Sequence, residues 1–135
     1  MLNRLSDLSQ ISLYLELFSG LDARGFLFGP LVSMSLNVPF LPVRKSGKLP
    51  GPTIKVSSTK EYGKDVLEIQ EDAIQKGQKV VVLDDLLATG GTLQAACQLV
   101  REAGGEVLQC VLLVELVELN GRSKVPAPCF SLVQF

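Results

Sequence analysis

Short apolar runs alternate with glycine-bearing turns and amphipathic stretches along most of this chain. Residues 13–18 form one apolar run that stops at Ser19-Gly20, and this pattern predicts a strand. The loop of residues 21–25 then leads into an expected helix that extends to about Leu36. The order of strand, loop and helix returns in the second half of the chain and is typical of an α/β protein.

The middle of the chain predicts a smaller structure beside the main sheet. Residues 40–43 predict a strand, but Pro42 favours an edge or a bulge because proline cannot donate a backbone hydrogen bond. Residues 46–53 hold two glycines and two prolines, a density that predicts an exposed loop. Two short runs, residues 54–58 and 66–69, then predict a hairpin or flap.

The second half of the chain has the clearest pattern. Residues 80–83 form an uninterrupted apolar run that stops at Asp84-Asp85, as expected for a strand covered on both faces. A helix that ends at Gly104-Gly105 follows, and residues 107–116 predict another apolar strand. The apolar stripe of this helix consists of Leu93, Ala96, Cys97 and Val100. We therefore expect an open, mostly parallel, doubly wound sheet with a small flap, and ligands beyond the carboxyl ends of its strands.

Composition narrows the class of function. The length of 135 residues fits one domain, and a formal net charge of −1 disfavours a nucleic-acid partner. The chain has no histidine, which excludes the Ser-His-Asp and Cys-His mechanisms and the H-E-x-x-H metalloproteases. No apolar run approaches the length of a membrane span, and the N-terminus does not resemble a signal peptide. The three cysteines form no C-x-x-C pair, so we expect reduced thiols and a cytoplasmic protein.

The candidate chemistry centres on the turn that follows the apolar run at residues 80–83. Ala88-Thr-Gly-Gly-Thr92 leads from a strand into a helix N-terminus, where unpaired amides and the positive end of the helix dipole suit a phosphate. Gly90 and Gly91 permit positive φ and a close approach of the backbone to an anion. Thr89 and Thr92 add hydroxyl donors.

Asp84 and Asp85 precede this turn, and we expect them to bind a different part of the ligand. Adjacent carboxylates repel a phosphate, but they suit hydroxyl groups or a hydrated Mg²⁺ ion. A ligand with a phosphate at one end and a pair of hydroxyls nearby is a ribose 5-phosphate. A Walker A loop is excluded, because Gly47-Lys48 is followed by Leu49.

The string from Val80 to Thr92 resembles the phosphoribosyl pyrophosphate signature of the type I phosphoribosyltransferase family. Three further blocks match that family, and the resemblance runs from about Leu13 to the end of the chain. These blocks are residues 20–30, 43–53 and 61–64. The resemblance implies a phosphoribosyltransferase domain over residues 13–135, preceded by a divergent segment of residues 1–12.

Among members of this family, the match is to those that act on adenine. The implied reaction transfers ribose 5-phosphate from phosphoribosyl pyrophosphate to adenine with Mg²⁺ as cofactor, and it releases pyrophosphate and AMP. This is a step of purine salvage, and the resemblance also implies a homodimer.

The resemblance further implies roles for individual residues. Asp22, Ala23 and Arg24 match the pyrophosphate loop, where Arg24 would grip the leaving group as its charge grows. Glu61 matches a lid residue that assists the incoming purine, with Tyr62 beside it on the lid or the phosphate. The basic residues of the implied lid are Arg44, Lys45 and Lys48. The remaining implied substrate contacts are Asp84, Asp85, Ala88, Thr89, Gly90, Gly91 and Thr92, with the two aspartates meeting Mg²⁺ through the substrate.

Other features either carry no expected role or depart from the family pattern. The acidic and basic residues expected only on a solvated face are Glu68, Glu71, Asp72 and Lys76. Family members carry an additional helix and a proline-containing hood over adenine ahead of the first core strand, and residues 1–12 show no such motif. Two hypotheses therefore stay open: an adenine-specific phosphoribosyltransferase, or a noncatalytic relative that binds the sugar phosphate or pairs with a full-length subunit.

Overall fold

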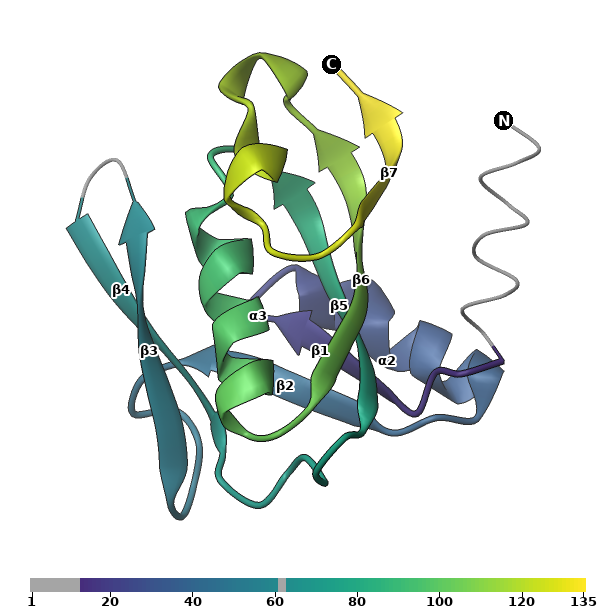
Figure 1. Cartoon of the computed structure of the whole chain (residues 1–135), viewed down its shortest axis with the longest axis vertical. Helices are drawn as coiled ribbons and strands as arrows, with labels where there is room; N and C mark the ends of the chain where they lie inside the picture. Colours follow the sequence, from purple (N-terminus) through teal and green to yellow (C-terminus); the bar gives the residue numbers. More distant parts are fainter. Residues whose placement is uncertain (1–12, 61–62) are drawn as a thin grey trace.

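The computed structural model describes residues 13–60 and 63–135, which form a sheet of seven strands in the order β3-β4-β2-β1-β5-β6-β7 (Figure 1). The strands are β1 (Leu17–Leu21), β2 (Phe40–Lys45), β3 (Thr53–Lys60), β4 (Gly63–Gln70), β5 (Lys79–Leu87), β6 (Glu106–Glu115) and β7 (Cys129–Gln134). The helical segments are α2 (Gly25–Leu36), α3 (Gly91–Glu102) and the short 3-10 turns η1 (Val117–Leu119) and η2 (Gly121–Lys124).

The sheet consists of a parallel core and an antiparallel arm. β2, β1, β5, β6 and β7 pair in parallel, which places their carboxyl ends along one edge. β3 and β4 form an antiparallel hairpin that stands beside α3 (Figure 1), and this confirms the predicted flap. The hairpin joins the core through the pairs Arg44↔Glu68 and Lys45↔Leu67.

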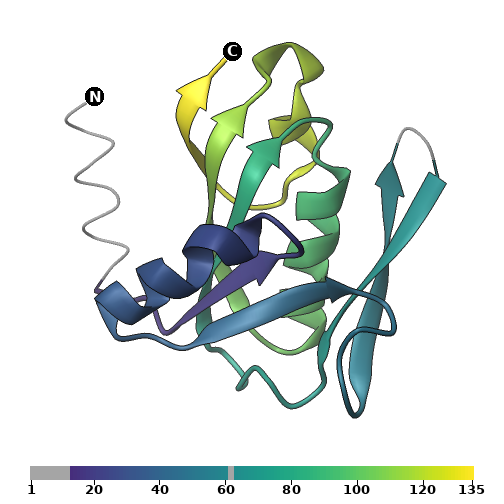
Figure 2. The same cartoon turned by 180° about the vertical axis from the view of Figure 1, so that it is seen from behind.

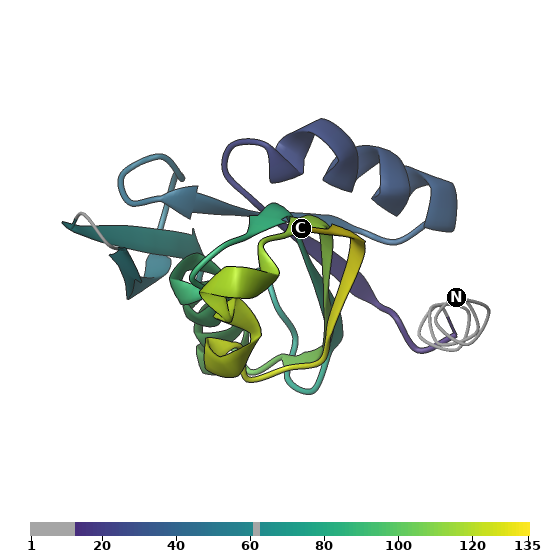
Figure 3. The ribbon, with the colours of Figure 1, turned by 90° about the horizontal axis from the view of Figure 1, so that it is seen from above.

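α2 and α3 cover opposite faces of the parallel core, so the sheet is doubly wound as predicted (Figure 3). Side chains of β5 alternate between the faces: Val80 and Val82 belong to the core cluster beneath α3, and Val81 and Leu83 belong to the cluster beneath α2. Burial on both faces is the physical reason for the uninterrupted apolar run.

The helices contact the sheet in different ways. The predicted stripe of α3 is buried, and the helix ends just before Gly104, which has φ +93°. α2 instead lies on β1 and β2 through small residues (Figure 2), and a Cβ on Gly29 would stand only 2.5 Å from the Phe40 ring. Neither α2 nor α3 combines the length and apolar character that crossing a bilayer requires.

Four boundaries or positions differ from the prediction. β1 begins at Leu17 rather than residue 13, and β7 was not predicted because its residues lack a continuous apolar run. β5 continues past the aspartates to Leu87, because β6 pairs with it as far as Leu87↔Glu115. β2 is not an edge strand. Pro42 is nevertheless accommodated, since β4 pairs with β2 only at Arg44 and Lys45 and the pair at Pro42 is with β1.

Candidate active site

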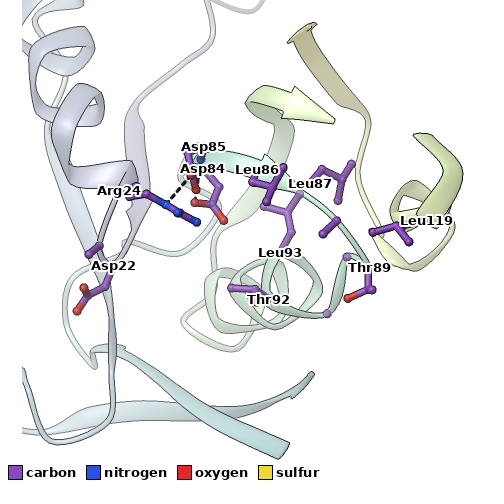
Figure 4. Close-up of a pocket in the computed structure, with 14 residues that line it drawn as sticks. Asp22, Arg24, Asp84, Asp85, Leu86, Leu87, Thr89, Thr92, Leu93 and Leu119 are labelled. Atoms are coloured by element: carbon purple, nitrogen blue, oxygen red, sulfur yellow. Dashed lines mark hydrogen bonds and ion pairs between the residues drawn. The ribbon is translucent and has the colours of Figure 1, made fainter. Parts of the chain in front are cut away.

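A cavity of about 410 Å³ opens at the carboxyl ends of β1 and β5. The loop after β1 contributes Asp22, Ala23 and Arg24, and the end of β5 with the start of α3 contributes residues 84–93 (Figure 4). Leu119 of η1 completes the lining. The two segments that the sequence places at one end of the sheet therefore do share one cavity.

The turn before α3 forms the floor of an anion site. Gly90 is the residue before the helix and has φ +84°, whereas Gly91 is already the first helical residue, so only Gly90 uses the positive φ that both glycines permit. Among the described residues, no side chain caps α3. Its first amides therefore remain free of a side-chain acceptor, and the turn from Ala88 to Thr92 lies on the cavity wall.

Gly121 supports this turn from behind, which sequence reasoning missed. A Cβ on Gly90 would stand 2.3 Å from the carbonyl oxygen of Gly121, and a Cβ on Gly121 would stand 2.2 Å from the carbonyl oxygen of Ala88. Two backbones can pack this closely only where both residues lack a side chain. The pairing spans 31 positions in the sequence and leaves no local pattern, so only the tertiary structure shows it.

A partly buried ion pair fixes the segment that carries Gly121. Arg122 donates from Nε and Nη2 to the carboxylate of Glu115 at 2.5 and 2.6 Å, and Glu115 also accepts from Ser131 and Gln134. The hydrogen bonds from Arg122 lower the pKa of Glu115 to about 2, although burial opposes that shift. The pair therefore links η2 to the ends of β6 and β7.

The paired aspartates face the cavity beside Arg24. Nε of Arg24 lies 2.6 Å from Oδ2 of Asp85, and the Asp85 amide donates to Oδ1 of Asp84 at 2.9 Å (Figure 4). Burial raises the pKa of Asp84 to about 7, the Asp85 amide opposes this shift, and the adjacent Asp85 carboxylate adds to it. Near neutral pH the pair therefore carries less than two full negative charges and can meet hydroxyl groups as acceptor and donor.

A second cavity adjoins the first and holds the predicted basic residues. It is lined by Asp22, Ala23 and Arg24 together with Arg44, Lys45 and Lys48. Nε of Arg44 lies 3.2 Å from Oδ2 of Asp22, and Nη1 of Arg44 donates to the carbonyl of Lys48 at 3.3 Å. Arg44 and Lys45 end β2 and Lys48 lies in the loop after it, so the structure brings all three to the pyrophosphate loop.

Glu68 contradicts the expectation of a solvated face. Its side chain is 1% exposed, and its carboxylate accepts hydrogen bonds from the Lys48 and Leu49 amides at 2.9 Å each and from the Thr53 hydroxyl at 3.2 Å. Burial raises the pKa of Glu68, but the hydrogen bonds from the loop amides and Thr53 outweigh it, so the pKa lies below its ordinary value. Three consecutive residues of β4, 67–69, are buried, so strand alternation could not reveal this position.

The two lid residues Glu61 and Tyr62 lie outside the described residues, as does the segment of residues 1–12. The structure does place four of the predicted groups: the phosphate turn (residues 88–92), the acidic pair, the pyrophosphate loop and the basic residues. Each of these four groups borders one of the two adjoining cavities.

Comparison with known families and structures agrees with this geometry. The sequence model of the family described as "Phosphoribosyl transferase domain" matches residues 16–132. Together with the doubly wound sheet and the turn before α3, this match defines a phosphoribosyltransferase domain.

Individual relatives refine the assignment. Adenine phosphoribosyltransferase of Rattus norvegicus is 56% identical over 122 residues, which cover 90% of this chain and 68% of that protein. The structure of adenine phosphoribosyltransferase from Saccharomyces cerevisiae, complexed with an iminoaltritol bisphosphate and adenine, superposes with a TM-score of 0.86 at 47% identity, covering 87% of this chain and 67% of that chain. The structure of adenine phosphoribosyl transferase from Trypanosoma brucei in complex with AMP, pyrophosphate and ribose-5-phosphate superposes with a TM-score of 0.85 at 31% identity. The match covers 93% of this chain and 61% of that chain. The chain belongs to the adenine phosphoribosyltransferases of this family, and it spans about two thirds of their length.

Proposed function

We propose that this protein transfers ribose 5-phosphate from phosphoribosyl pyrophosphate to adenine and releases AMP and pyrophosphate, a reaction of purine salvage. One observation carries the proposal: the phosphate turn, the twin carboxylates and the basic residues line two adjoining cavities at one edge of the sheet. The ligands named for the relatives from S. cerevisiae and T. brucei support the choice of adenine and of AMP.

Each part of the site fits one part of this substrate. The amides of the turn from Ala88 to Thr92 suit the 5-phosphate, because the N-terminus of α3 stabilises an anion. Asp84 and Asp85 suit the ribose hydroxyls. Arg24, with the basic residues of the second cavity, suits the pyrophosphate.

The chemical step needs charge stabilisation at two places. As the bond from the ribose to pyrophosphate breaks, positive charge develops on the sugar and negative charge grows on the leaving group. Arg24 can stabilise the leaving group with its guanidinium once pyrophosphate replaces Asp85 as its partner, and Arg44 and Lys48 add positive charge. The released Asp85 then faces the electron-poor ribose.

We also propose Mg²⁺ as the cofactor. Among the described residues no cluster of three or more Asp, Glu or Cys side chains is suited to hold an ion. Mg²⁺ commonly binds through one or two carboxylates together with substrate phosphates, and Asp84 and Asp85 fit that mode. Bound in this way, the ion would neutralise charge on the pyrophosphate.

The role of Glu61 as the group that assists the purine stays a prediction, and so does a contact of Tyr62 with the lid or the phosphate. Both residues belong to the connection between β3 and β4, the arm that joins the core beside Arg44 and Lys45. A lid at this place would exclude water during the transfer.

A homodimer and a cytoplasmic location are further parts of the proposal. The outward face of α2 exposes Leu27, Leu31 and Met34, which are 74%, 65% and 77% exposed, and a second copy of the chain could cover them. Light scattering of the parent protein and of a Leu31→Lys variant tests this face. The three cysteines are free thiols, which supports a reducing compartment such as the cytosol.

The decisive experiment measures turnover. The protein is mixed with Mg²⁺, labelled adenine and phosphoribosyl pyrophosphate, and the label in AMP is counted beside an Asp84→Asn, Asp85→Asn double variant. Label in AMP with the parent protein alone supports the enzyme. Binding of phosphoribosyl pyrophosphate by calorimetry without any AMP would support the noncatalytic relative instead.

A further inference from the structure

Glu68 is a buried carboxylate to which the sequence assigns no role, and it sits where the β3–β4 arm meets the parallel core. In the strand register it stands opposite Arg44 of β2 on one side and opposite Lys55 of β3 on the other. Charged side chains are seldom fully buried unless they are paired. The hydrogen-bond donors around Glu68 therefore show which part of the structure its negative charge stabilises.

The loop after β2 supplies most of these donors. Oε1 of Glu68 accepts from the backbone amides of Lys48 and Leu49, both at 2.9 Å. Oε2 accepts from the Thr53 hydroxyl at 3.2 Å and lies 3.8 Å from the ammonium of Lys55. Hydrogen bonds to an ionised acceptor are about twice as strong as neutral ones, so the carboxylate fixes the backbone of the loop at Lys48 and Leu49.

The fixed loop connects Glu68 to the second cavity, which is lined by Arg44, Lys45 and Lys48 and is called the basic cavity below. The carbonyl of Lys48 accepts a hydrogen bond from Nη1 of Arg44 at 3.3 Å, and Nε of Arg44 lies 3.2 Å from Asp22 in the pyrophosphate loop. Arg44 and Lys48 both line the cavity beside Arg24, whereas Glu68 does not. Glu68 therefore acts on the site from outside the cavity, through the backbone that it holds.

We propose that Glu68 is a positioning residue that, by anchoring the Lys48–Leu49 backbone, holds Arg44 and Lys48 where they bind the pyrophosphate of the substrate. This inference rests on the proposed function, because it assumes that pyrophosphate occupies the basic cavity. It differs from a general role in folding, because it affects one end of the substrate only.

That difference defines the experiment. Glu68→Gln keeps the size of the side chain but removes the charge, and Glu71→Gln removes a charge from an exposed neighbouring side chain as the matched control. Calorimetry with Mg²⁺ then measures the binding of pyrophosphate and of phosphoribosyl pyrophosphate to each protein. It also measures the binding of ribose 5-phosphate, which needs the turn before α3 but not the basic cavity.

We expect Glu68→Gln to weaken both pyrophosphate-containing ligands by about tenfold, which corresponds to about 1.4 kcal/mol, and to change ribose 5-phosphate binding less than about twofold. The ratio kcat/KM for phosphoribosyl pyrophosphate should fall by at least a similar factor, because Arg44 and Lys48 also face the leaving group as its charge grows. Equal losses for all three ligands, or no loss for any, would overturn the inference.

Two further outcomes keep the test decisive. If circular dichroism shows Glu68→Gln to be unfolded, Thr53→Val removes one hydrogen bond from the same carboxylate and should weaken pyrophosphate by about twofold to threefold while sparing ribose 5-phosphate. The same criteria then apply to that variant. A parent protein that binds no phosphoribosyl pyrophosphate would overturn the proposed function itself, whereas a binding parent with an unaffected Glu68→Gln variant overturns only the role of Glu68.

Discussion

Arg24 and Asp85 both line the cavity and form an ion pair, with 2.6 Å between Nε and Oδ2. Arg24 is the group proposed to grip pyrophosphate, and Asp85 is one of the two proposed to meet the ribose. Each neutralises the other before substrate arrives. Because the Arg24 side chain is 68% exposed, the pair contributes little to stability and can exchange for a ligand at low cost.

Replacing Arg24 by Gln should therefore impair the reaction without unfolding the protein. We expect kcat for AMP formation to fall by about 10²- to 10³-fold, the range seen when one preorganised donor to a developing anion is lost. The free energy of unfolding should change by no more than about 0.5 kcal/mol. Steady-state kinetics and thermal unfolding check both values, with Lys76→Gln as an exposed control. A kcat within about threefold of the parent would contradict the role of Arg24.

Asp84→Asn should stabilise the ligand-free protein while reducing its activity. The pKa of Asp84 is raised from 3.8 to about 7, so the folded state holds the proton more tightly than the unfolded state and stability falls as pH rises from about 4 to 7. Asparagine stays neutral and can still accept from the Asp85 amide. At pH 8 we expect unfolding of the variant to cost about 1–3 kcal/mol more than unfolding of the parent. Denaturant titrations at pH 4 and pH 8 test this, and a gain that is equal at both values would refute the assignment.

Gly121→Ala should displace the backbone of the phosphate turn at Ala88. Its new Cβ would stand 2.2 Å from the Ala88 carbonyl, a contact that forces the two backbones apart. Overpacking of this kind costs about 1–3 kcal/mol of stability. We expect ribose 5-phosphate and phosphoribosyl pyrophosphate to lose affinity together, the opposite of the selective loss expected for Glu68→Gln. Unchanged binding of ribose 5-phosphate by a folded variant would show that the contact does not shape the turn.

Glu115→Gln should be costly at neutral pH and less so in acid. The pKa of Glu115 is lowered from 4.5 to about 2, so its contribution to stability is complete above about pH 4.5 and is lost as the pH falls towards 2. Removing one partner of a buried ion pair costs about 3–5 kcal/mol, and we expect about 2–3 here because Arg122 is 39% exposed. Unfolding curves of parent and variant at pH 7 and pH 3 should differ less at the lower pH. A constant difference would contradict the lowered pKa.

Local patterns predicted the parts of this protein that depend on neighbouring residues. The stripe of α3, the buried run of β5 and the turn at Gly90 follow from residues within a few positions of one another. The course of β5 beyond Asp84 did not, because it depends on pairing with β6.

The missed parts of the site depend on contacts between distant segments. From the sequence alone Glu68 is expected at the surface, because its burial depends on the loop after β2 that packs over it. The role of Gly121 likewise depends on its close contact with Gly90. Neither contact leaves a periodic or motif signal in the sequence. The resemblance of the string from Val80 to Thr92 supplied the substrate, which periodicity alone could not identify.

A crystal structure with Mg²⁺ and phosphoribosyl pyrophosphate tests the central claim most directly. The account predicts the 5-phosphate on the amides between Ala88 and Thr92, the ribose hydroxyls at Asp84 and Asp85, and Arg24 moved from Asp85 to the pyrophosphate. A ligand bound away from both cavities, or one bound with the Arg24–Asp85 pair intact and the turn before α3 empty, would contradict it.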